Sequence, residues 1–547
     1  MEVSSRQIVT FAFASRSLVL LLQFLANLLL PDHDADVFLP PVDKREFSVL
    51  DHAVHFLFSG LMRWDAVYFS HIAHYGYTYE NCVAFFPFFP ITVSSVAHVL
   101  SYLGVLHLSS WILLAAVITN FILFILAALS FFHVGKHALG DPQVSFFATI
   151  LFCFNPASIF MSAAYSETLY FFLLVHALLA VNAKAFYAAS FLIGLSVLTR
   201  SNGLVGIGFV LHSLGNSFFK ELSSIHWCGK KLTYSQIVPF YISCIVKTIF
   251  RVVLCSIICS AAFFAYQFFI YTQFCTRKGS VFVPEHLISY GRARGYNIVG
   301  DSPSPWCNDT FPMSYTNIQK HHWGVGFMNY YEVKQIPNFI LAFPVILLSV
   351  RSCLFFVRKS GKSFFQLGFG NSLNYFMRNT SQARDKKRDS LSDDEVDMDE
   401  IDAKSQVWKP STAEHSHRIV VYIFHLIGLT VFGCCFVHIQ VLTRLLFSSS
   451  PLLYWYCGML WYRDRASQMP SPRRRTQSHP KVLNSSSWMD VATHKIRSTI
   501  VKCQCSPLLD ILENWANLSL EFQLVVIYFV FYFIVGTVMF SNFLPWT

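Results

Sequence analysis

Charge is scarce in this sequence. Only 13% of its 547 residues are Asp, Glu, Lys or Arg, whereas 54% are hydrophobic. A soluble domain usually carries about 25% charged residues, so the composition excludes an ordinary soluble enzyme. The short alternating segments of a membrane β-barrel are also missing. Apolar runs of roughly 20 residues recur instead, and we predict an all-α polytopic membrane protein.

Signals for metal and nucleic-acid binding are weak as well. The 14 cysteines show no zinc-site spacing, and His71 and His74 have no evident third ligand. The formal charge of +10 is concentrated in a few loops, where it reports membrane orientation. We therefore expect no metal, no cofactor and no nucleic-acid partner.

Long apolar segments predict about 10–12 membrane segments. The clear ones lie at roughly 8–30, 109–132, 144–160, 168–183, 249–272, 336–357, 419–440 and 523–544, and less certain ones lie at 85–106, 186–216 and 450–462. The polar stretch Arg200–Gly203 interrupts 186–216. It predicts two short helices that meet at a break, because backbone without helical bonds needs protein or water around it.

Basic loops set the expected orientation. The loops 220–231, 351–362 and 463–475 are rich in Lys and Arg, so they are expected in the cytosol. The loops 31–84 and 273–335 then face the opposite compartment, the lumen. This side is oxidising, so a disulfide can form there, but the sequence does not say which of the luminal cysteines pair: Cys82, Cys275 and Cys307.

Segment 85–106 decides where the middle of the chain lies. If it spans the membrane, residues 155–160 face the cytosol. If it only dips into the luminal side, 155–167 and 200–203 face the lumen. Pro87 and Pro90 favour a bent, re-entrant segment and therefore the luminal placement.

These observations give a linear organisation of anchors, luminal loops and inserts. The expected parts are a retained N-terminal anchor (1–30), a first luminal loop (31–84), membrane helices (85–272), a second luminal loop (273–335), a membrane helix (336–357), a disordered cytosolic linker (358–418), membrane helices (419–462), a polar basic insert (463–520) and a C-terminal membrane helix (521–547).

The triplet Arg63, Trp64 and Asp65 lies in the first luminal loop. Charged groups kept at a membrane face are often functional, and a carboxylate there can act as a general base for a hydroxyl nucleophile. An interfacial helix with a snorkelling Arg63 and a solvated Asp65 explains the triplet equally well.

Other polar residues interrupt apolar runs or crowd the luminal loops. The polar residues within or beside apolar runs are typical of a binding site for a phosphate-bearing lipid. A buried Glu167–Arg200 ion pair or a hydrogen-bond network between helices explains these residues nearly as well. The polar residues in the luminal loops are typical of a pocket for a sugar or a lipid headgroup, or of a packed cap. The candidates are Glu167, Arg200, Asn202, His438, Gln440 and Arg444 in the first set, and Glu80, His322 and Trp323 in the second.

Five stretches resemble, in the same order, the PIG-V family, the GPI mannosyltransferase 2 of the endoplasmic reticulum. They are "RWDAVYFSHIAHYGYTYENCVAFFPFFP", "FNPASIFMSAAYSETLYF", "LTRSNGLVGIGF", "PWCNDTFPMSYTNIQKHHWGVGFMNYYEVKQIPNFILAFP" and "HIQVLTRLLFSSSPLLYW". The resemblance covers about residues 50–460, the last helix is also in keeping with it, and the inserts 360–415 and 463–510 match nothing in it.

The resemblance implies a GT-C-type glycosyltransferase whose active site lies on the luminal side of the endoplasmic reticulum membrane. Its donor is dolichyl-phosphate mannose, and it adds the second mannose, in α-1,6 linkage, to the precursor of the glycosylphosphatidylinositol (GPI) anchor. Such enzymes place a catalytic acid in the first luminal loop, and the matching residue is Asp65. The resemblance implies neither a metal nor a nucleotide-sugar site.

A β-linked donor and an α-linked product imply inversion by a single displacement. This reaction needs one base at the acceptor and cations at the leaving phosphate. We expect Asp65 as the base and Arg200 and Arg444 at the phosphate, with Glu80, Asn202 and amides of 308–335 orienting the sugars.

Three other functions remain open from the residues alone. A lipid transporter or scramblase would also carry broken helices and membrane charges, but no inverted repeat is evident. A non-catalytic scaffold would tolerate loss of Asp65. A sister transferase would use another acceptor. A small accessory membrane subunit also remains open as a partner.

Overall fold

The computed structural model describes residues 4–42, 46–224, 234–276, 282–369, 413–468 and 506–546. Most of the predicted linker 358–418 and of the predicted insert 463–520 therefore lies outside the described residues. At their edges, α13 continues to Ser360 and α18 to Gln468. The structure does not test the roles expected for these inserts.

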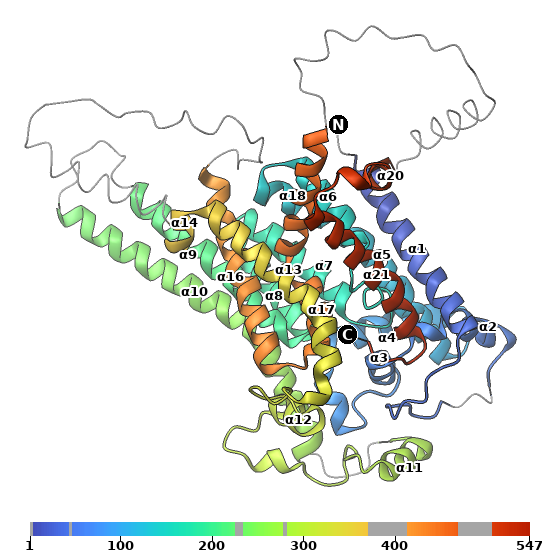
Figure 1. Cartoon of the computed structure of the whole chain (residues 1–547). Helices are drawn as coiled ribbons and strands as arrows, with labels where there is room; N and C mark the ends of the chain where they lie inside the picture. The colour runs from blue at the N-terminus through green and yellow to red at the C-terminus, as the bar shows by residue number, and fades with distance from the viewer. Residues whose placement is uncertain are drawn as a thin grey trace, which may run out of the picture.

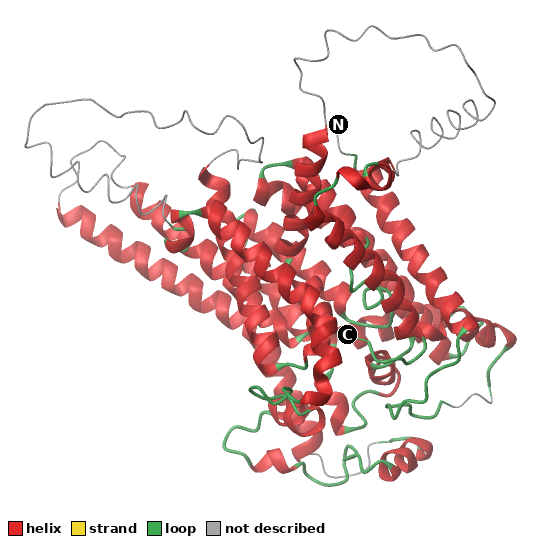
Figure 2. Cartoon of the chain, in the orientation of Figure 1, coloured by secondary structure: helices red, strands yellow, loops and turns green. Residues whose placement is uncertain are grey.

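Helices form all the regular structure of the described residues (Figure 2). The main helices are α1 (Ser5–Leu29), α2 (Val49–Phe58), α3 (Asp65–Tyr75), α4 (Phe88–Ser101), α5 (Leu108–Leu139), α6 (Pro142–Cys153), α7 (Glu167–Asn182), α8 (Phe186–Thr199), α9 (Ile207–Ser224), α10 (Tyr234–Tyr271), α11 (Glu285–Ala293), α12 (Ser314–Trp323), α13 (Ile336–Ser360), α14 (Lys362–Phe365), α16 (Ala413–Phe436), α17 (Leu442–Ser449), α18 (Pro451–Gln468), α20 (Ser506–Glu513) and α21 (Leu520–Ser541). The predicted all-α membrane fold is confirmed.

Six of these helices are long and apolar enough to cross a membrane, judged among the described residues. They comprise Ser5–Leu29, Leu108–Leu139, Val238–Thr276, Val333–Ser360, His417–Phe436 and Leu520–Ser541. Shorter apolar helices, such as α6, α7 and α8, pack between them. The expected total of about 10–12 membrane segments stays a prediction.

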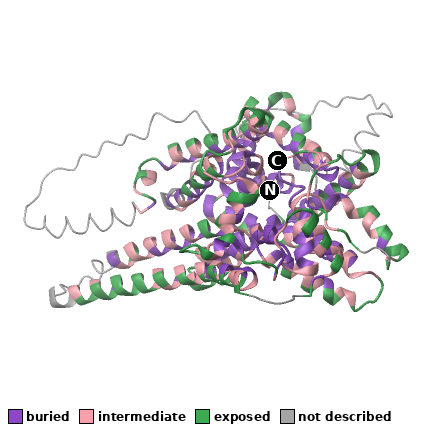
Figure 3. Ribbon diagram, turned by 90° about the horizontal axis from the view of Figure 1, so that it is seen from below, coloured by how far each residue is buried: buried purple, intermediate pink, exposed green. Residues whose placement is uncertain are grey.

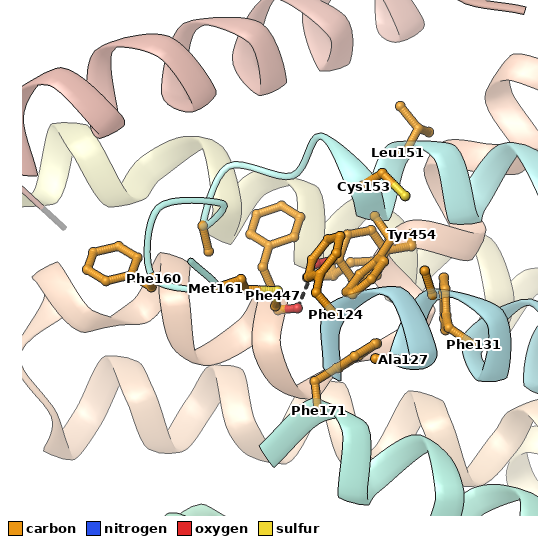
Figure 4. Packing of buried hydrophobic residues seen from close by; sticks show 14 of the residues in the cluster. Phe124, Ala127, Phe131, Leu151, Cys153, Phe160, Met161, Phe171, Phe447 and Tyr454 are labelled. Atoms are coloured by element: carbon orange, nitrogen blue, oxygen red, sulfur yellow. Dashed lines mark hydrogen bonds between the residues drawn. The ribbon is translucent and has the colours of Figure 1, made fainter. Parts of the chain in front are cut away.

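The core of the bundle surrounds α5 and is built from stacked aromatic rings. Phe124 stacks on Phe152 with ring centroids 4.8 Å apart, and Phe152 stacks on Phe171 at 4.6 Å. Tyr454 of α18 meets Phe152 edge to face at 5.5 Å, and Figure 4 shows Phe124, Phe171 and Tyr454 of this cluster. Aromatic pairs at these distances stabilise beyond their buried area, so this cluster fixes α5, α6, α7 and α18 against one another.

The predicted break in 186–216 is confirmed. Helix α8 ends at Thr199, a 3-10 turn occupies Ser201–Gly206, and α9 begins at Ile207. Gly203 allows the chain to turn here, because a Cβ at this position would lie 2.7 Å from the backbone of Ser196. The break therefore exposes Arg200 and its neighbours to the interior of the bundle.

The segment expected to dip into the membrane holds one short helix. Helix α4 has only 14 residues, fewer than the roughly 20 that a span needs. The backbone N–H of Ala164 donates to the carbonyl of Leu61 at 3.3 Å. The buried loop 154–166 therefore lies on the same side of the bundle as Asp65.

Arg16 anchors this loop from inside α1. Its side chain is buried, and its guanidinium donates to the carbonyl of Ser158 at 2.8 Å and to the hydroxyl of Ser162 at 2.7 Å. A third bond reaches the carbonyl of Cys153 at 3.1 Å. A buried charge is costly unless it is hydrogen-bonded, so Arg16 and the loop stabilise each other.

A cap of short helices covers the Asp65 end of the bundle (Figure 1). It contains α11 and α12, and a disulfide joins Cys275 to Cys307 with their Cα atoms 5.5 Å apart. The third candidate cysteine, Cys82, is a buried free thiol. The sequence left open whether and how these three cysteines pair, and the structure joins Cys275 to Cys307.

A buried histidine of α3, His71, predicts acid sensitivity. The Nε2 atom of His71 lies 2.5 Å from the hydroxyl of Thr78. Burial, followed by the charges of His74 and His286, lowers the pKa of His71 to about 3, against about 6.5 in an unfolded chain. The unfolded state therefore binds more protons below pH 6.5, and this contribution to stability is lost as the pH falls from 6.5 toward 3.

We expect the thermal unfolding midpoint in detergent to be level near pH 7.5 and to fall below pH 6.5. His71→Gln can keep a hydrogen bond without titrating, so it should show a smaller acid loss. His98→Gln, at an exposed position, is the matched control and should keep the wild-type loss. An unchanged acid loss in His71→Gln would contradict the assignment.

Candidate active site

Asp65 is the first residue of α3, and an unusual turn presents it. Trp64, just before it, has φ +55°, a left-handed conformation that is strained for a non-glycine residue. The backbone N–H of Asp65 donates to the hydroxyl of Tyr165 at 3.1 Å. Tyr165 comes from the loop that Arg16 anchors, so loop 154–166 and α3 position the carboxylate together.

Asp65 pairs with Arg444 of α17. One guanidinium nitrogen lies 2.6 Å from Oδ2, and the two side chains are 26% and 17% exposed. The guanidinium also lies 5.4 Å from the ring centre of Phe160 and 5.5 Å from that of Tyr165. The pair is thus walled by aromatic rings yet reachable from outside, as a reacting group must be.

A second ion pair lies close to the first. Arg200 forms a very short contact with Glu167, whose side chain is fully buried, whereas that of Arg200 is 17% exposed. The charge of Glu167 also acts on Arg444. The predicted alternative of a Glu167–Arg200 ion pair is therefore observed, and both arginines expected at a phosphate are neutralised by carboxylates.

Helix α17 connects the two pairs. Besides carrying Arg444, it ends at Ser449, whose hydroxyl accepts a hydrogen bond from the amide of Asn202 at 2.9 Å. The hydroxyl groups of Ser201 and Tyr315 lie 2.7 Å apart, which ties the helix break to α12 of the cap. Asp65, Arg444, Arg200 and Asn202 thus belong to one site.

Several polar atoms in this site are buried without a hydrogen-bond partner among the described residues. They are the second carboxylate oxygen of Glu167, Nε of Arg200, Oδ1 of Asn202, and the hydroxyls of Ser166 and Ser450. Buried polar groups normally find partners. Their concentration beside two ion pairs indicates a place where a polar ligand binds.

Arg63 lies in a separate cluster. It pairs with Asp32 at 2.9 Å, and its other donors reach the side chain of Asn27 at 2.7 Å and the carbonyl of Ser541 at 3.0 Å. Trp64 packs edge to face on Phe543, with ring centroids 5.9 Å apart. These contacts join the α3 turn to α1 and to the end of α21, so Arg63 holds the turn in place.

Glu80 belongs to the cap. Its carboxylate accepts from the indole N–H of Trp306 at 2.7 Å and from the amide of Asn297 at 3.2 Å. Both partners come from the loop 273–335. Glu80 therefore joins the loop 31–84 to the loop 273–335, and its side-chain partners among the described residues do not include Asp65.

Aromatic residues of the cap form a wall beside α3. Trp323 lies 6.2 Å from Tyr68, one turn after Asp65, and 5.9 Å from Phe85, measured between ring centroids. His438 stacks on Tyr330 at 4.5 Å.

The other two cap candidates are less specific. Burial lowers the pKa of His322, whose ring adjoins that of Trp323. Gln440 is half-buried in the turn Ile439–Val441. These observations assign no chemical role to His322 or Gln440.

Sequence reasoning missed three residues that organise the site. Arg16 is a charged residue within the first apolar run, which is itself a signal of function or buried pairing. Tyr165 stands two residues before Glu167, but a tyrosine in an apolar stretch carries no distinct signal. Trp306 pairs with Glu80 across 226 residues of sequence, and no local pattern predicts such a contact.

Comparison with known sequences shows the family to which the chain belongs. A sequence model of the family described as mannosyltransferase (PIG-V) matches residues 5–547. The chain belongs to the PIG-V family. The matched range also takes in the first helix and both inserts, in addition to residues 50–460 and the last helix.

Relatives of this PIG-V family member span almost its whole length. The chain is 34% identical over 548 residues to the GPI alpha-1,6-mannosyltransferase 2 of Cricetulus griseus, covering 100% of this chain and 99% of that protein. It is 31% identical over 547 residues to the Homo sapiens protein of the same name, with the same coverage. It is 32% identical to the GPI mannosyltransferase 2 of Drosophila pseudoobscura pseudoobscura over 83% of this chain and 90% of that protein.

The protein is therefore a multi-pass membrane glycosyltransferase. Family membership gives the reaction class, and the helices long enough to span a membrane give the setting. The sister-transferase alternative lies within this class, whereas a transporter or a non-catalytic scaffold lies outside it.

Proposed function

We propose that this PIG-V family member transfers the second mannose, in α-1,6 linkage, from dolichyl-phosphate mannose to the GPI precursor in the lumen of the endoplasmic reticulum. The names of the full-length relatives support the acceptor and the linkage. The observation that carries the chemistry is the reachable carboxylate of Asp65 paired with Arg444. The two groups supply the base and the cation that this transfer needs.

Asp65 acts on the acceptor. It takes the proton from the 6-hydroxyl of the first mannose, while that oxygen forms a bond to the anomeric carbon of the donor sugar. The bond from this carbon to the phosphate oxygen breaks in the same step. Attack on the face opposite to the leaving group turns a β-linked donor into an α-linked product.

Arg444 acts on the donor. The leaving dolichyl phosphate carries away the electron pair and needs positive charge rather than a general acid. A planar guanidinium binds phosphate with two parallel hydrogen bonds. When Arg444 turns to the phosphate, it releases Asp65 from the ion pair, so donor binding itself frees the base.

The Glu167–Arg200 pair suits sugar hydroxyls better than phosphate. Glu167 already neutralises Arg200, and a buried carboxylate beside a phosphate would repel it. The unpaired oxygens of Glu167 and Asn202 are acceptors for hydroxyl donors. We therefore assign Arg200, Glu167 and Asn202 to the transferred mannose, rather than Arg200 to the phosphate as first expected.

Arg200→Lys is expected to lower kcat/KM by about 10–100-fold, because a hydrogen bond to a charged group contributes about 1.5–3 kcal/mol and lysine cannot keep the fork geometry. Transfer by detergent-solubilised membranes measures this. Arg294→Lys is the matched control, since Arg294 pairs with Asp36 on the exposed surface. Wild-type kinetics in Arg200→Lys would contradict the assignment.

Glycosylation of Asn308 tests the proposed placement of the cap in the lumen. It begins the sequon Asn308–Thr310 and is exposed in the cap, and such sequons are glycosylated in the lumen. We expect a glycan that glycosidase treatment removes, with a band shift that Asn308→Gln abolishes. If a sequon engineered into the exposed basic end of α13 is modified instead, the proposed orientation is wrong.

Cells that lack this step test the proposed function. Expression of the wild-type chain should restore GPI-anchored proteins at the cell surface and consume the monomannosylated precursor. A well-expressed wild-type chain that leaves this precursor unconsumed, while another mannosyl acceptor is used, would favour the sister-transferase alternative.

A further inference from the structure

A basic cavity lies between α13, α18 and α21, apart from the Asp65 site. Its volume is about 280 Å³, and four cationic side chains line it: Arg351, Arg358, Lys359 and Arg463. Among the described residues that line it, Glu521 is the only acidic one. The cavity therefore has an excess of positive charge.

Two of the four cations are already paired. Arg351 donates to Glu521 at 2.8 Å, and the hydroxyl of Tyr456 also bonds to that carboxylate. Arg463 lies 3.3 Å from Asp464. Within the described parts of the chain, Arg358 and Lys359 have no carboxylate within 4.0 Å. The unneutralised charge is therefore concentrated on these two neighbours.

The cavity is far from the transfer site. Glu521 lies in the first turn of α21, whereas Ser541 at the other end of the same helix bonds to Arg63, next to Trp64 and Asp65. Twenty residues of helix span about 30 Å, the thickness of the hydrocarbon core. Figure 1 shows the start of α21 and the cap at opposite ends of the bundle. The cavity thus lies at the opposite membrane face, which the basic residues mark as cytosolic.

One wall of the cavity is apolar and opens toward lipid. It is lined by Leu354 and Phe355 of α13 and by Leu460 of α18. Leu354 and Leu347, which lies on the same face of α13, are each 48% exposed, and this helix is apolar enough to cross a membrane. A ligand that fills this cavity has an anionic head beside Arg358 and Lys359 and an apolar tail along α13.

We propose that this cavity binds the headgroup of an anionic phospholipid from the leaflet opposite the active site. Basic pockets between membrane helices on the cytoplasmic side are suited to anionic headgroups. Inorganic phosphate offers the same anion but leaves the apolar wall unused. The proposal is independent of the sugar donor and acceptor.

Titration of the purified full-length chain with short-chain lipids tests the site, with the thermal unfolding midpoint as the readout, because a ligand that binds the folded state raises this midpoint. Dioctanoyl phosphatidylserine should raise the midpoint, and dioctanoyl phosphatidylcholine should not. Arg358→Gln/Lys359→Gln should need about thirty-fold more phosphatidylserine for the same rise, as expected for two basic contacts. Lys136→Gln/Lys247→Gln, exposed cations on α5 and α10, should behave as wild type.

Each other outcome overturns the proposal. An equal rise with phosphatidylcholine means that charge is not recognised. An equal rise with inorganic phosphate means that the occupant is a free anion. If the Arg358/Lys359 variant binds as the wild type does, or the control variant loses binding equally, the cavity is not the site.

Discussion

Asp65→Asn is expected to lower kcat by about 10²–10⁴-fold, the usual contribution of a general base. Asparagine has nearly the shape of aspartate but cannot accept the proton of the acceptor hydroxyl at neutral pH. The neighbouring Arg444 loses its counter-ion and stays available to the donor phosphate, so the KM for the donor should not rise. Transfer from labelled donor by purified protein, with donor and acceptor varied separately, measures both constants.

The control for this variant is Asp36→Asn. Asp36 also forms an aspartate–arginine pair, with Arg294, but on the exposed surface, and its loss should leave kcat unchanged. A purely structural role of Asp65 would instead reduce the amount of folded protein and leave kcat per folded molecule near wild type. That result would remove Asp65 from the mechanism.

Arg444→Met is expected to lower kcat/KM by about 10²–10³-fold, as for the loss of one preorganised group that stabilises transition-state charge. Methionine keeps apolar contact with Phe160 and Tyr165 but cannot bind phosphate. Unlike Asp65→Asn, this variant should also raise the KM for the donor. Arg444→Lys should recover part of the loss, because lysine restores the charge without the fork geometry.

The double variant Asp65→Asn/Arg444→Met separates an active pair from a merely structural one. Because the two groups act in one step, their losses should not add. Arg294→Met is the matched control for the arginine change and should keep wild-type constants. Fully additive losses with an unchanged KM for the donor would contradict the role of Arg444 at the phosphate.

Local signals predicted the features that depend on a few neighbouring residues. The polar stretch Arg200–Gly203 in an apolar run predicted the break between α8 and α9, because unbonded backbone is excluded from lipid. Pro87 and Pro90 favoured a bent segment here, and α4 begins between them and has only 14 residues. Asp65 was singled out by its position at a membrane face and by the family resemblance.

Features that depend on distant partners could not be predicted in this way. Arg63 stands two residues from Asp65 in sequence, yet its guanidinium bonds to Asp32, Asn27 and Ser541. The α3 turn at Trp64 determines this divergence, and no pattern in the sequence specifies a positive φ for tryptophan.

The hydrogen-bond and ion-pair partners of Glu80 and Arg200 could not be predicted from the sequence either. Glu80 was expected near the sugars, but its carboxylate bonds to Trp306 and Asn297. Arg200 was expected at a phosphate, but a fully buried Glu167 neutralises it. In each case the observed partner lies far away in the chain, and only the tertiary structure reveals that contact.

The most direct test of the proposed reaction is transfer by the purified chain in liposomes. The donor is dolichyl-phosphate mannose with a labelled, β-linked sugar, and the acceptor is a GPI precursor that carries one mannose. The label should appear in a dimannosylated glycolipid, in an α-1,6 linkage, and GDP-mannose should not replace the donor. A β-linked product, or transfer from GDP-mannose alone, would contradict the proposed mechanism.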